Sequence, residues 1–112
     1  MERRYRLSRS RDFDTVYRHG RSTSTRFFTL YVFPRGGGVE ARLGLAIPRS
    51  VGTAVKRNHL KRTLREVWRT KERTGGFDFV LVARPGLAEA AEAHGFSWLI
   101  ERVDEVIGKA NP

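Results

Sequence analysis

A dense run of basic side chains in the middle of the chain is the strongest sign of chemistry in the sequence. Between Arg49 and Arg73 there are nine Lys and Arg residues against two acids, Glu66 and Glu72. On a generic helix such a run is only a solvated surface, but this density of positive charge repels itself strongly unless a polyanion binds. Lys and Arg neutralise phosphates and release the counterions around them, which makes the binding salt dependent. The run therefore predicts contact with a nucleic acid.

Side chains that could catalyse a reaction are few and poorly spaced. The histidines His19, His59 and His94 have no metal-binding spacing, and the chain has no cysteine. Close acid pairs occur at residues 12 and 14 and at residues 104 and 105. Their spacing points the two acids of each pair to different helix faces, which favours capping and solvated charge over acid–base catalysis. We therefore expect no catalytic residue and no metal site on the protein itself.

Length, composition and charge limit the class of protein. The chain has 112 residues, a net charge of +10 and 39% hydrophobic residues, which predicts one folded domain over residues 1–112 and excludes a disordered basic tail. The charge is +13 on residues 1–75 and −3 on residues 76–112, so the first two-thirds must form the basic surface. Without cysteine, a secretory signal or a long apolar span, the expected location is cytoplasmic.

Periodicity in the first half predicts a helix and two strands. Apolar residues at helical spacing favour a short helix over about 9–19, ending at Gly20. Residues 25–33 are β-branched and aromatic, with apolar side chains on both faces, and predict a strand. The glycine-rich stretch 34–38 has no phosphate-loop signature and predicts a turn. Residues 42–47 are then expected to pair with the first strand as an antiparallel hairpin, with small residues on one face that leave an open floor.

The second half predicts a helix, a buried strand and a closing helix. Residues 53–71 carry an apolar stripe and, on the other side, a polar and basic face. The stripe consists of Leu60, Leu64, Val67 and Trp68, and the basic face of Asn58, Lys61, Arg62, Arg65 and Arg69. Residues 77–83 form a nearly continuous apolar run typical of a buried strand, and residues 97–107 predict an amphipathic helix. A strand–helix–strand crossover follows, and general rules predict that it is right-handed.

Aromatic residues offer a second way to contact nucleic acid. Phe13 and Tyr17 share one face of the first predicted helix, while Phe27 and Tyr31 lie on one face of the first predicted strand. The ordinary interpretation is that they are core or half-buried sheet residues. Exposed aromatic rings also stack on unpaired bases without regard to sequence, so both interpretations stay open at this stage.

The middle of the chain resembles a known family. Residues 42–68 read RLGLAIPRSVGTAVKRNHLKRTLREVW, which is similar to the signature of the bacterial ribonuclease P protein subunit: R-x-G-L, V-G-x-A-V and R-N-R-x-K-R-x-x-R. Flanking segments at 7–21, 25–32 and 77–85 agree in order, so the resemblance covers about residues 5–86. Two motifs depart from the pattern. The R-N-R motif is Arg57-Asn58-His59, and the usual S-K-K is Pro48-Arg49-Ser50, which weakens or removes two positive charges beside Lys56.

The resemblance implies a fold. It is a single two-layer α+β domain, ribosomal protein S5 domain 2-like, in which an N-terminal helix precedes three strands, a helix, a strand and a final helix. Its first strand would lie near residues 21–25, where periodicity gives no signal. The crossover around the basic helix would be left-handed, against the general rule.

The resemblance also implies a function. The family joins a catalytic RNA subunit and helps it to remove the 5′ leader from precursor tRNA, while the RNA and its Mg²⁺ ions carry the chemistry. The chain would be part of an endoribonuclease whose product keeps a 5′ phosphate. By match to the family, a cleft for the single-stranded leader would be lined by Phe13, Tyr17 and Tyr31. The RNA subunit would be bound by Arg49, Lys56, Arg57, Asn58, His59, Lys61, Arg62 and Arg65.

Two other functions remain possible on the sequence alone. A ribosomal-protein-like module would bind RNA or DNA without a processing role, and would not distinguish tRNA with a leader from tRNA without one. A self-sufficient protein nuclease would cleave RNA without an RNA subunit. The sequence does not define the oligomeric state, a metal bound by the protein, or substrates other than tRNA.

Overall fold

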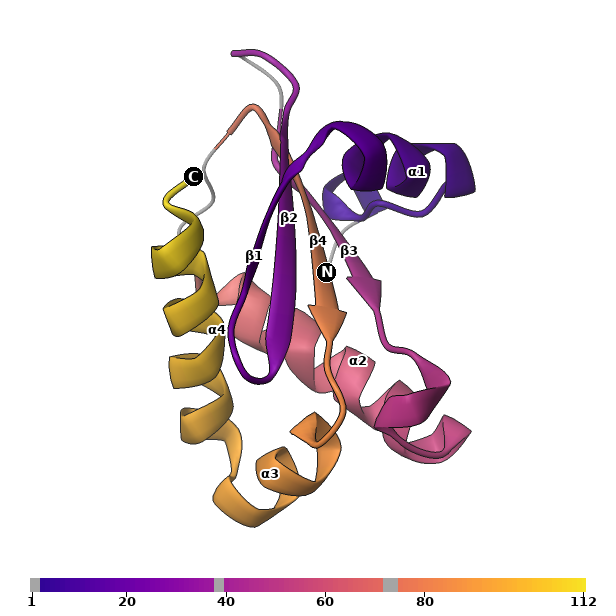
Figure 1. Ribbon diagram of the computed structural model, residues 1–112, viewed down its shortest axis with the longest axis vertical. Coiled ribbons are helices and arrows are strands. Elements are labelled where there is room, and N and C mark those ends of the chain that lie inside the picture. The colour runs from indigo at the N-terminus through magenta and orange to yellow at the C-terminus, as the bar shows by residue number, and fades with distance from the viewer. Residues whose placement is uncertain (1–2, 38–39, 72–74) are drawn as a thin grey trace.

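Two strands with apolar side chains on both faces form the centre of a mixed four-stranded sheet. In the computed structural model, which describes residues 3–37, 40–71 and 75–112, β2 (Phe28–Pro34) pairs antiparallel with β4 (Phe77–Ala83). The edge strands are β1 (Arg21–Ser24), antiparallel to β2, and β3 (Arg42–Ala46), parallel to β4. The strand order is therefore β1-β2-β4-β3 (Figure 1). Strands with apolar side chains on both faces are stable where both faces are covered. This is the case in the centre of a sheet that has other elements packed on each side.

The predicted hairpin between the second and third strands is wrong. β3 does not pair with β2, because β4 lies between them and pairs with both. β4 buries apolar residues on both of its faces, whereas the outer face of β3 carries only Arg42, Gly44 and Ala46. The strand with more apolar surface gains more from the central position, and the strand with small and charged residues tolerates the edge.

Helices cover the two faces of the sheet unequally (Figure 1). The helices are α1 (Ser10–His19), α2 (Ala54–Arg69), α3 (Leu87–His94) and α4 (Phe96–Ala110), with short 3₁₀ turns at Arg3–Tyr5 and Arg49–Val51. The inner face of the sheet packs against α2 and α4, and this pair of layers contains the main core. The outer face is covered in part by α1 and by Leu7 of the segment before it, over a smaller cluster around Leu7, Val16 and Val80. The sheet therefore has a filled face and a partly open one.

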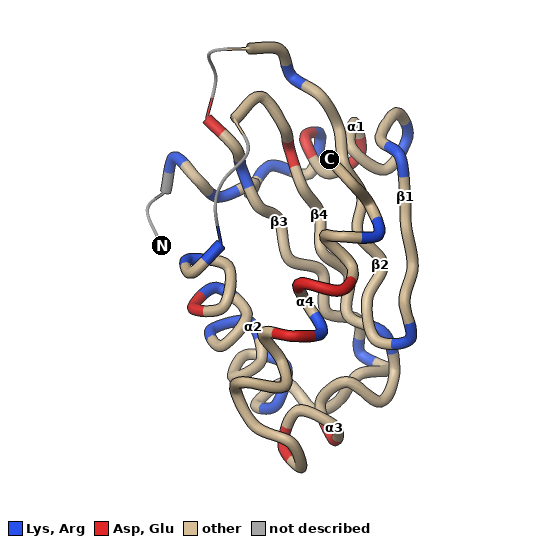
Figure 2. Tube along the Cα trace, turned by 90° about the vertical axis from the view of Figure 1, so that its left-hand side faces the viewer, with Lys and Arg blue, Asp and Glu red and all other residues tan. Residues whose placement is uncertain are grey.

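The crossover from β3 through α2 to β4 is left-handed, so the general rule was wrong and the family resemblance correct. The apolar stripe of α2 packs on the inner face, where Trp68 contacts Phe79 with ring centroids 5.3 Å apart. Figure 2 shows the molecule from the side of α4, with β4 to the right of β3. A right-handed crossover with the same strand order would bring α2 to the outer face. There the residues of β3 offer it almost no apolar surface, which is a physical reason for the exception.

Most predicted element boundaries agree with the structure. The first helix, the basic helix, the strand at 77–83 and the closing helix are confirmed, although the closing helix extends to Ala110. The apolar stripe of α2 is buried in full, and the Thr53 hydroxyl accepts a hydrogen bond from the Lys56 backbone N–H at 3.2 Å at the start of the helix. The strand predicted at 25–33 begins three residues later, at Phe28. Among the described residues, no helix is both long and apolar enough to span a membrane.

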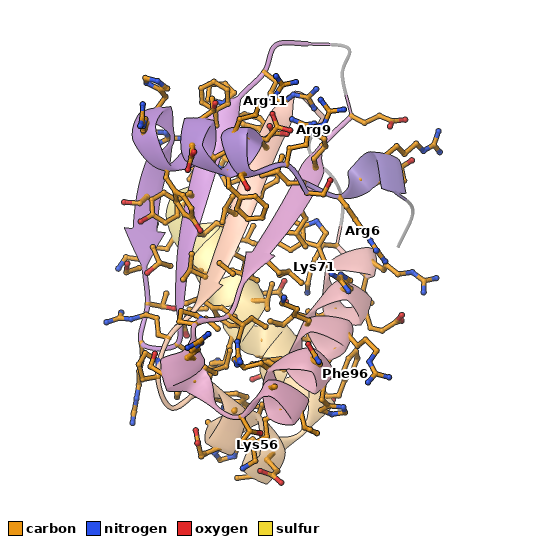
Figure 3. All side chains as sticks on the ribbon, turned by 90° about the vertical axis from the view of Figure 1, so that its right-hand side faces the viewer. Arg6, Arg9, Arg11, Lys56, Lys71 and Phe96 are labelled. Atoms are coloured by element: carbon orange, nitrogen blue, oxygen red, sulfur yellow. The ribbon has the colours of Figure 1, made fainter. Side chains whose placement is uncertain are left out.

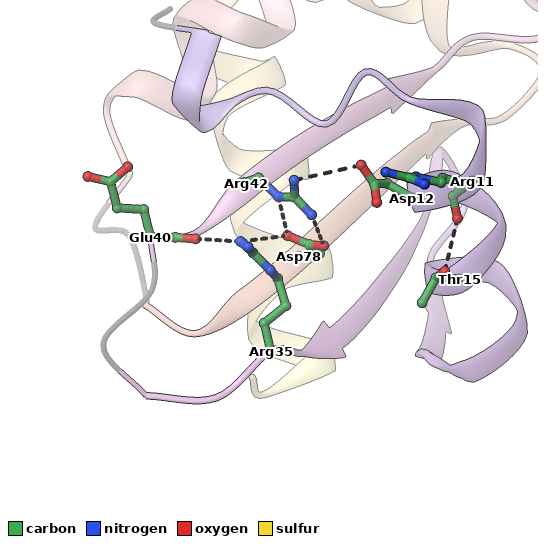
Figure 4. A network of polar contacts seen from close by, with 7 residues as sticks. All are labelled: Arg11, Asp12, Thr15, Arg35, Glu40, Arg42 and Asp78. Atoms are coloured by element: carbon green, nitrogen blue, oxygen red, sulfur yellow. Dashed lines mark hydrogen bonds and ion pairs between the residues drawn. The ribbon is translucent and has the colours of Figure 1, made fainter.

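One buried carboxylate ties the outer face together. Asp78 in β4 is 3% exposed and accepts two hydrogen bonds from Arg42, from Nε to Oδ1 at 2.9 Å and from Nη2 to Oδ2 at 2.8 Å. Arg35 approaches the same carboxylate at 3.4 Å, and Arg42 reaches Asp12 of α1 at 3.7 Å (Figure 4). The hydrogen bond to Asp78 raises the pKa of Arg42, partly offset by burial. This network, which we call the Asp78 network, joins β4 to β3 and α1.

The Asp78 network makes a prediction about stability. Asp78→Asn leaves two arginines beside a neutral amide in a buried position, and we expect it to lower the free energy of unfolding by about 3 kcal/mol. Urea denaturation followed by circular dichroism measures the change. The control is Glu66→Gln, which breaks an exposed ion pair with Arg69 on α2 and should cost less than about 1 kcal/mol. Equal losses in both variants would contradict a special role for the buried carboxylate.

Candidate nucleic-acid interface

Three aromatic rings meet on the outer face of the sheet, and we call them the aromatic group. The ring centroids of Phe13 and Tyr17, both on α1, are 6.3 Å apart, and Tyr17 contacts Tyr31 of β2 edge to face at 4.9 Å. Tyr17 is 39% exposed, and the other two rings are half-buried. The structure therefore brings together all three residues that the family resemblance places in a leader cleft. It also shows that they pack on each other, as the structural interpretation of these aromatics expected.

The register of the sheet explains how the aromatic group is positioned. Tyr31 lies opposite Val80, and Val80 lies opposite Gly44, so these residues form one row across the outer face. A Cβ added to Gly44 would come within 2.6 Å of the Phe13 ring, so the absence of a side chain there makes room for this ring. The open floor predicted from the small residues of β3 is thus filled at Gly44.

A second row on the outer face remains partly open. Thr29, Val82 and Ala46 follow each other across β2, β4 and β3 and are only half-buried. The Thr29 hydroxyl lies 2.9 Å from that of Ser24 on β1. This row continues the surface of the aromatic group with small and apolar side chains.

Burial raises the pKa of Tyr17, and the neighbouring Tyr31 and Asp14 raise it further. The phenol therefore stays neutral throughout the physiological pH range. A neutral phenol can donate a hydrogen bond to a phosphate oxygen and adds no negative charge next to a polyanion.

The basic face of α2 is accessible along its length. Asn58, His59 and Arg62 are exposed, while Lys61 and Arg65 are half-buried. Arg62 points directly away from the apolar stripe, as the helical spacing predicts. These side chains form a continuous polar strip on one helix, as the sequence indicated.

The residues around the start of α2 are less uniform than the family motif suggests. Arg57 is half-buried and donates from Nε to the Gly52 carbonyl oxygen at 3.2 Å, so part of its donor capacity holds the turn before the helix. Lys56 is exposed and lies 3.9 Å from Glu92 of α3. Arg49 is exposed in the 3₁₀ turn that precedes α2. The three charges surround the beginning of the helix and do not lie along its basic face.

Two residues that the sequence analysis did not select complete this surface. Arg6 and Phe96 line a hollow of about 430 Å³ over α2, together with Arg62 and Arg65. Arg6 reaches α2 because Leu7 donates a backbone hydrogen bond to Leu43 at 2.9 Å and thereby ties the N-terminal segment to β3. Burial lowers the pKa of Arg65, and the positive charge of Arg6 lowers it further. Helical periodicity cannot reveal such contacts between distant segments.

Charge is segregated in space as it is along the chain. Figure 2 shows acidic positions on α3 and α4, and the acids there are Glu89, Glu92, Glu101, Asp104 and Glu105. Figure 3 shows the opposite side, where Arg6, Arg9 and Arg11 lie near α1 and α2, and where Lys56 and Lys71 at the two ends of α2 form ion pairs with Glu92 and Asp104. A polyanion is therefore attracted to the side with α1, α2 and the outer face of the sheet. Among the described residues, no three His, Asp or Glu side chains lie close enough together to hold a metal ion.

Comparison with known proteins identifies the family. The family model "Ribonuclease P" matches residues 1–110. A ribonuclease P protein component of Lactobacillus delbrueckii subsp. bulgaricus is 39% identical over 101 residues, which cover 88% of this chain and 78% of that protein. The corresponding protein of Halalkalibacterium halodurans is 32% identical over 111 residues, covering 96% and 93%.

Solved structures agree with the sequence relatives. The ribonuclease P protein of Thermotoga maritima superposes with a TM-score of 0.79 at 32% identity, covering 89% of this chain and 92% of that one. The protein of Staphylococcus aureus gives a TM-score of 0.78 at 27% identity, covering 93% of both chains. In sequence and in fold, the chain belongs to the ribonuclease P protein family.

Proposed function

We propose that this protein binds the catalytic RNA subunit of ribonuclease P through α2 and the 5′ leader of precursor tRNA through the aromatic group, in the cytoplasm. The observation that carries the proposal is that both surfaces lie on the basic side of a chain that belongs to this family. The outer face of the sheet lies between them (Figure 3). One structured RNA and one single strand could therefore be held at the same time.

The two surfaces suit different parts of the RNA. Arginine and lysine contacts to phosphates fix position and orientation without reading sequence. Stacking on aromatic rings tolerates any base, which suits a leader whose sequence differs from one tRNA to the next. The RNA subunit and its Mg²⁺ ions supply the hydrolysis of the phosphodiester bond. The protein side chains hold and orient the RNA and take no chemical step.

The holoenzyme assay tests this proposal. We expect the protein to lower the Mg²⁺ concentration that the cognate RNA subunit needs to cleave precursor tRNA, because its cations replace part of the screening that Mg²⁺ provides. We also expect tighter binding of precursor than of mature tRNA. Cleavage rates measured across a Mg²⁺ series, with and without protein, check the first point, and equilibrium binding checks the second.

The same assay separates the alternative functions. No stimulation at low Mg²⁺ would overturn the proposal. Equal affinity for tRNA with and without a leader would favour an RNA-binding module without a processing role. Cleavage by nuclease-treated protein without the RNA subunit would identify a self-sufficient protein nuclease.

The aromatic group makes a separate prediction. In the holoenzyme, Phe13→Ala or Tyr17→Ala should weaken the binding of precursor tRNA by about 1–3 kcal/mol for each lost stack and leave mature tRNA unaffected. Fluorescence titration with labelled substrates measures both affinities. Tyr17→Phe keeps the ring and is the matched control, so it should bind the leader nearly as well as the unchanged protein. An equal loss for precursor and mature tRNA would show that these rings do not contact the leader.

Arg62 makes a prediction about salt dependence. Arg62→Ala removes an exposed cation opposite the apolar stripe, so it should weaken binding of the RNA subunit without loss of fold. The slope of log affinity against log salt should become shallower by about one unit. Filter binding at several salt concentrations measures the slope. Arg26→Ala, an exposed arginine before β2, is the control and should leave the slope unchanged. An unchanged slope for Arg62→Ala would remove this residue from the interface.

A further inference from the structure

Two hollows meet on the surface of α2, and their linings differ in chemistry. The arginine hollow, of about 430 Å³, is lined by Arg6, Arg62, Arg65 and the acid Glu66. The apolar hollow, of about 600 Å³, lies between α2, α3 and α4 and is lined by Val55, Leu60, Ala88, Ala91 and Leu99. His59, Thr63 and Phe96 line both and form the wall between them. A ligand at this wall meets cations on one side and apolar surface on the other.

Among the described residues, no acid pairs with the three arginines of the arginine hollow. The Nε atom of Arg6 is buried and has no hydrogen-bond partner among the described residues. Arg6 and Arg65 line the same hollow, and besides burial, which is the larger cause, the positive charge of Arg6 lowers the pKa of Arg65. The single acid of the lining, Glu66, pairs instead with Arg69 at 3.1 Å. An anion with several oxygen atoms can accept charge-assisted hydrogen bonds from neighbouring guanidinium groups and offset their repulsion.

The apolar hollow exposes an aromatic ring at the start of α4. Phe96 is 46% exposed at the first position of α4, and Val55 across the hollow is 79% exposed. The charged and polar groups of its lining include Lys56 and His59 on α2 and the acid Glu92 of α3, which lies 3.9 Å from Lys56. Its volume is in the usual range for sites that bind small, largely apolar groups. A flat base fits against Phe96, whereas a base within a duplex would remain stacked on its neighbours.

We propose that the two hollows form one binding site for an unpaired segment of RNA, in which Arg6, Arg62 and Arg65 hold a phosphate while Phe96 stacks on a neighbouring base. The inference rests on the proposed function, because the RNA that reaches α2 is the RNA subunit. It adds Arg6 and Phe96 to the interface and gives α2 a contact with a base as well as contacts with phosphates. Figure 3 shows Arg6 near the C-terminal end of α2 and Phe96 near its middle.

Affinity for the cognate RNA subunit, measured with the full chain at several salt concentrations, tests both halves of the site. Phe96→Ala should weaken binding by about fivefold or more with an unchanged salt slope, because a stack is lost and no charge. Arg6→Gln should weaken binding and make the slope shallower by about 0.7–0.9, because one phosphate contact is lost. Phe96→Tyr and Arg26→Gln are the matched controls and should bind like the unchanged protein.

Chemical probing of the RNA subunit locates the base. At saturating protein, at least one unpaired base should be protected by the unchanged chain and become reactive again with Phe96→Ala. Phe96→Leu keeps the apolar volume without the ring and should also leave this base reactive. Thermal denaturation shows whether each variant is folded, and Phe96→Leu takes the place of Phe96→Ala if the alanine variant is not.

The outcomes separate this inference from the proposed function. If the unchanged chain does not bind the RNA subunit, both fail. If it binds but the alanine and leucine variants at position 96 match it in affinity and in base protection, only the nucleotide site is overturned. Concentration-dependent dimerisation that is lost in Phe96→Ala, with RNA affinity unchanged, would instead assign the apolar hollow to a second copy of the chain and would also overturn the inference.

Discussion

The outer face of this protein depends on one buried carboxylate. Asp78 lies in the central strand β4, where an unpaired charge would cost several kcal/mol, so the chain must bring a cation to it. Arg42 of β3 does so with two parallel hydrogen bonds, and its guanidinium also reaches Asp12 of α1. The electrostatic requirement of a single residue thereby fixes β3 beside β4 and the start of α1 above both. The position of Phe13 over Gly44 follows from this arrangement, because both belong to segments that the network holds.

The two faces of the central strands β2 and β4 differ in their role. The inner face contributes to stability, and the outer face is available to a ligand. On the inner face Phe28, Leu30 and Val32 are buried with α2 and α4 in the main core. On the outer face the cover is smaller, from α1 and Leu7 before it, and the sheet there keeps half-buried apolar and aromatic side chains. A complete second layer would add buried area and stability but would remove the surface on which a single strand can lie. The partial cover by one short helix is consistent with a face that is kept for a ligand.

The sequence predicted those features that depend on local periodicity. The stripe of α2, the first helix and the strand at 77–83 each have a pattern that a single element can satisfy, and all three were correct. Strand order and crossover handedness were not predictable in this way, because they depend on which strand gains most from the centre and on which face is apolar. Asp78 is a single charged residue within an apolar run. Only its partner Arg42, 36 positions away in the sequence, explains why a buried carboxylate is tolerated there. The roles of Phe13, Tyr17, Tyr31 and the basic residues came from the resemblance to the family, and the geometry shows only that they are placed together.

The surplus of positive charge causes repulsion between basic side chains in the free protein, and the fold determines where the compensating acids lie. Arg6 and Arg65 repel each other in the free protein, and the buried Nε of Arg6 has no acceptor among the described residues. Acids on the same helix face would relieve this repulsion, but they would also repel a phosphate. Most acids of the last third of the chain instead lie on α3 and α4, where they reduce the net charge of the whole molecule at a distance from α1 and the Arg62 face of α2. Screening by water and salt weakens interactions between distant charges more than those between charges in contact, so these acids offset little of the positive charge on the Arg62 face of α2. The free protein therefore keeps an unfavourable local interaction that binding of an anion would remove, and this difference adds to affinity.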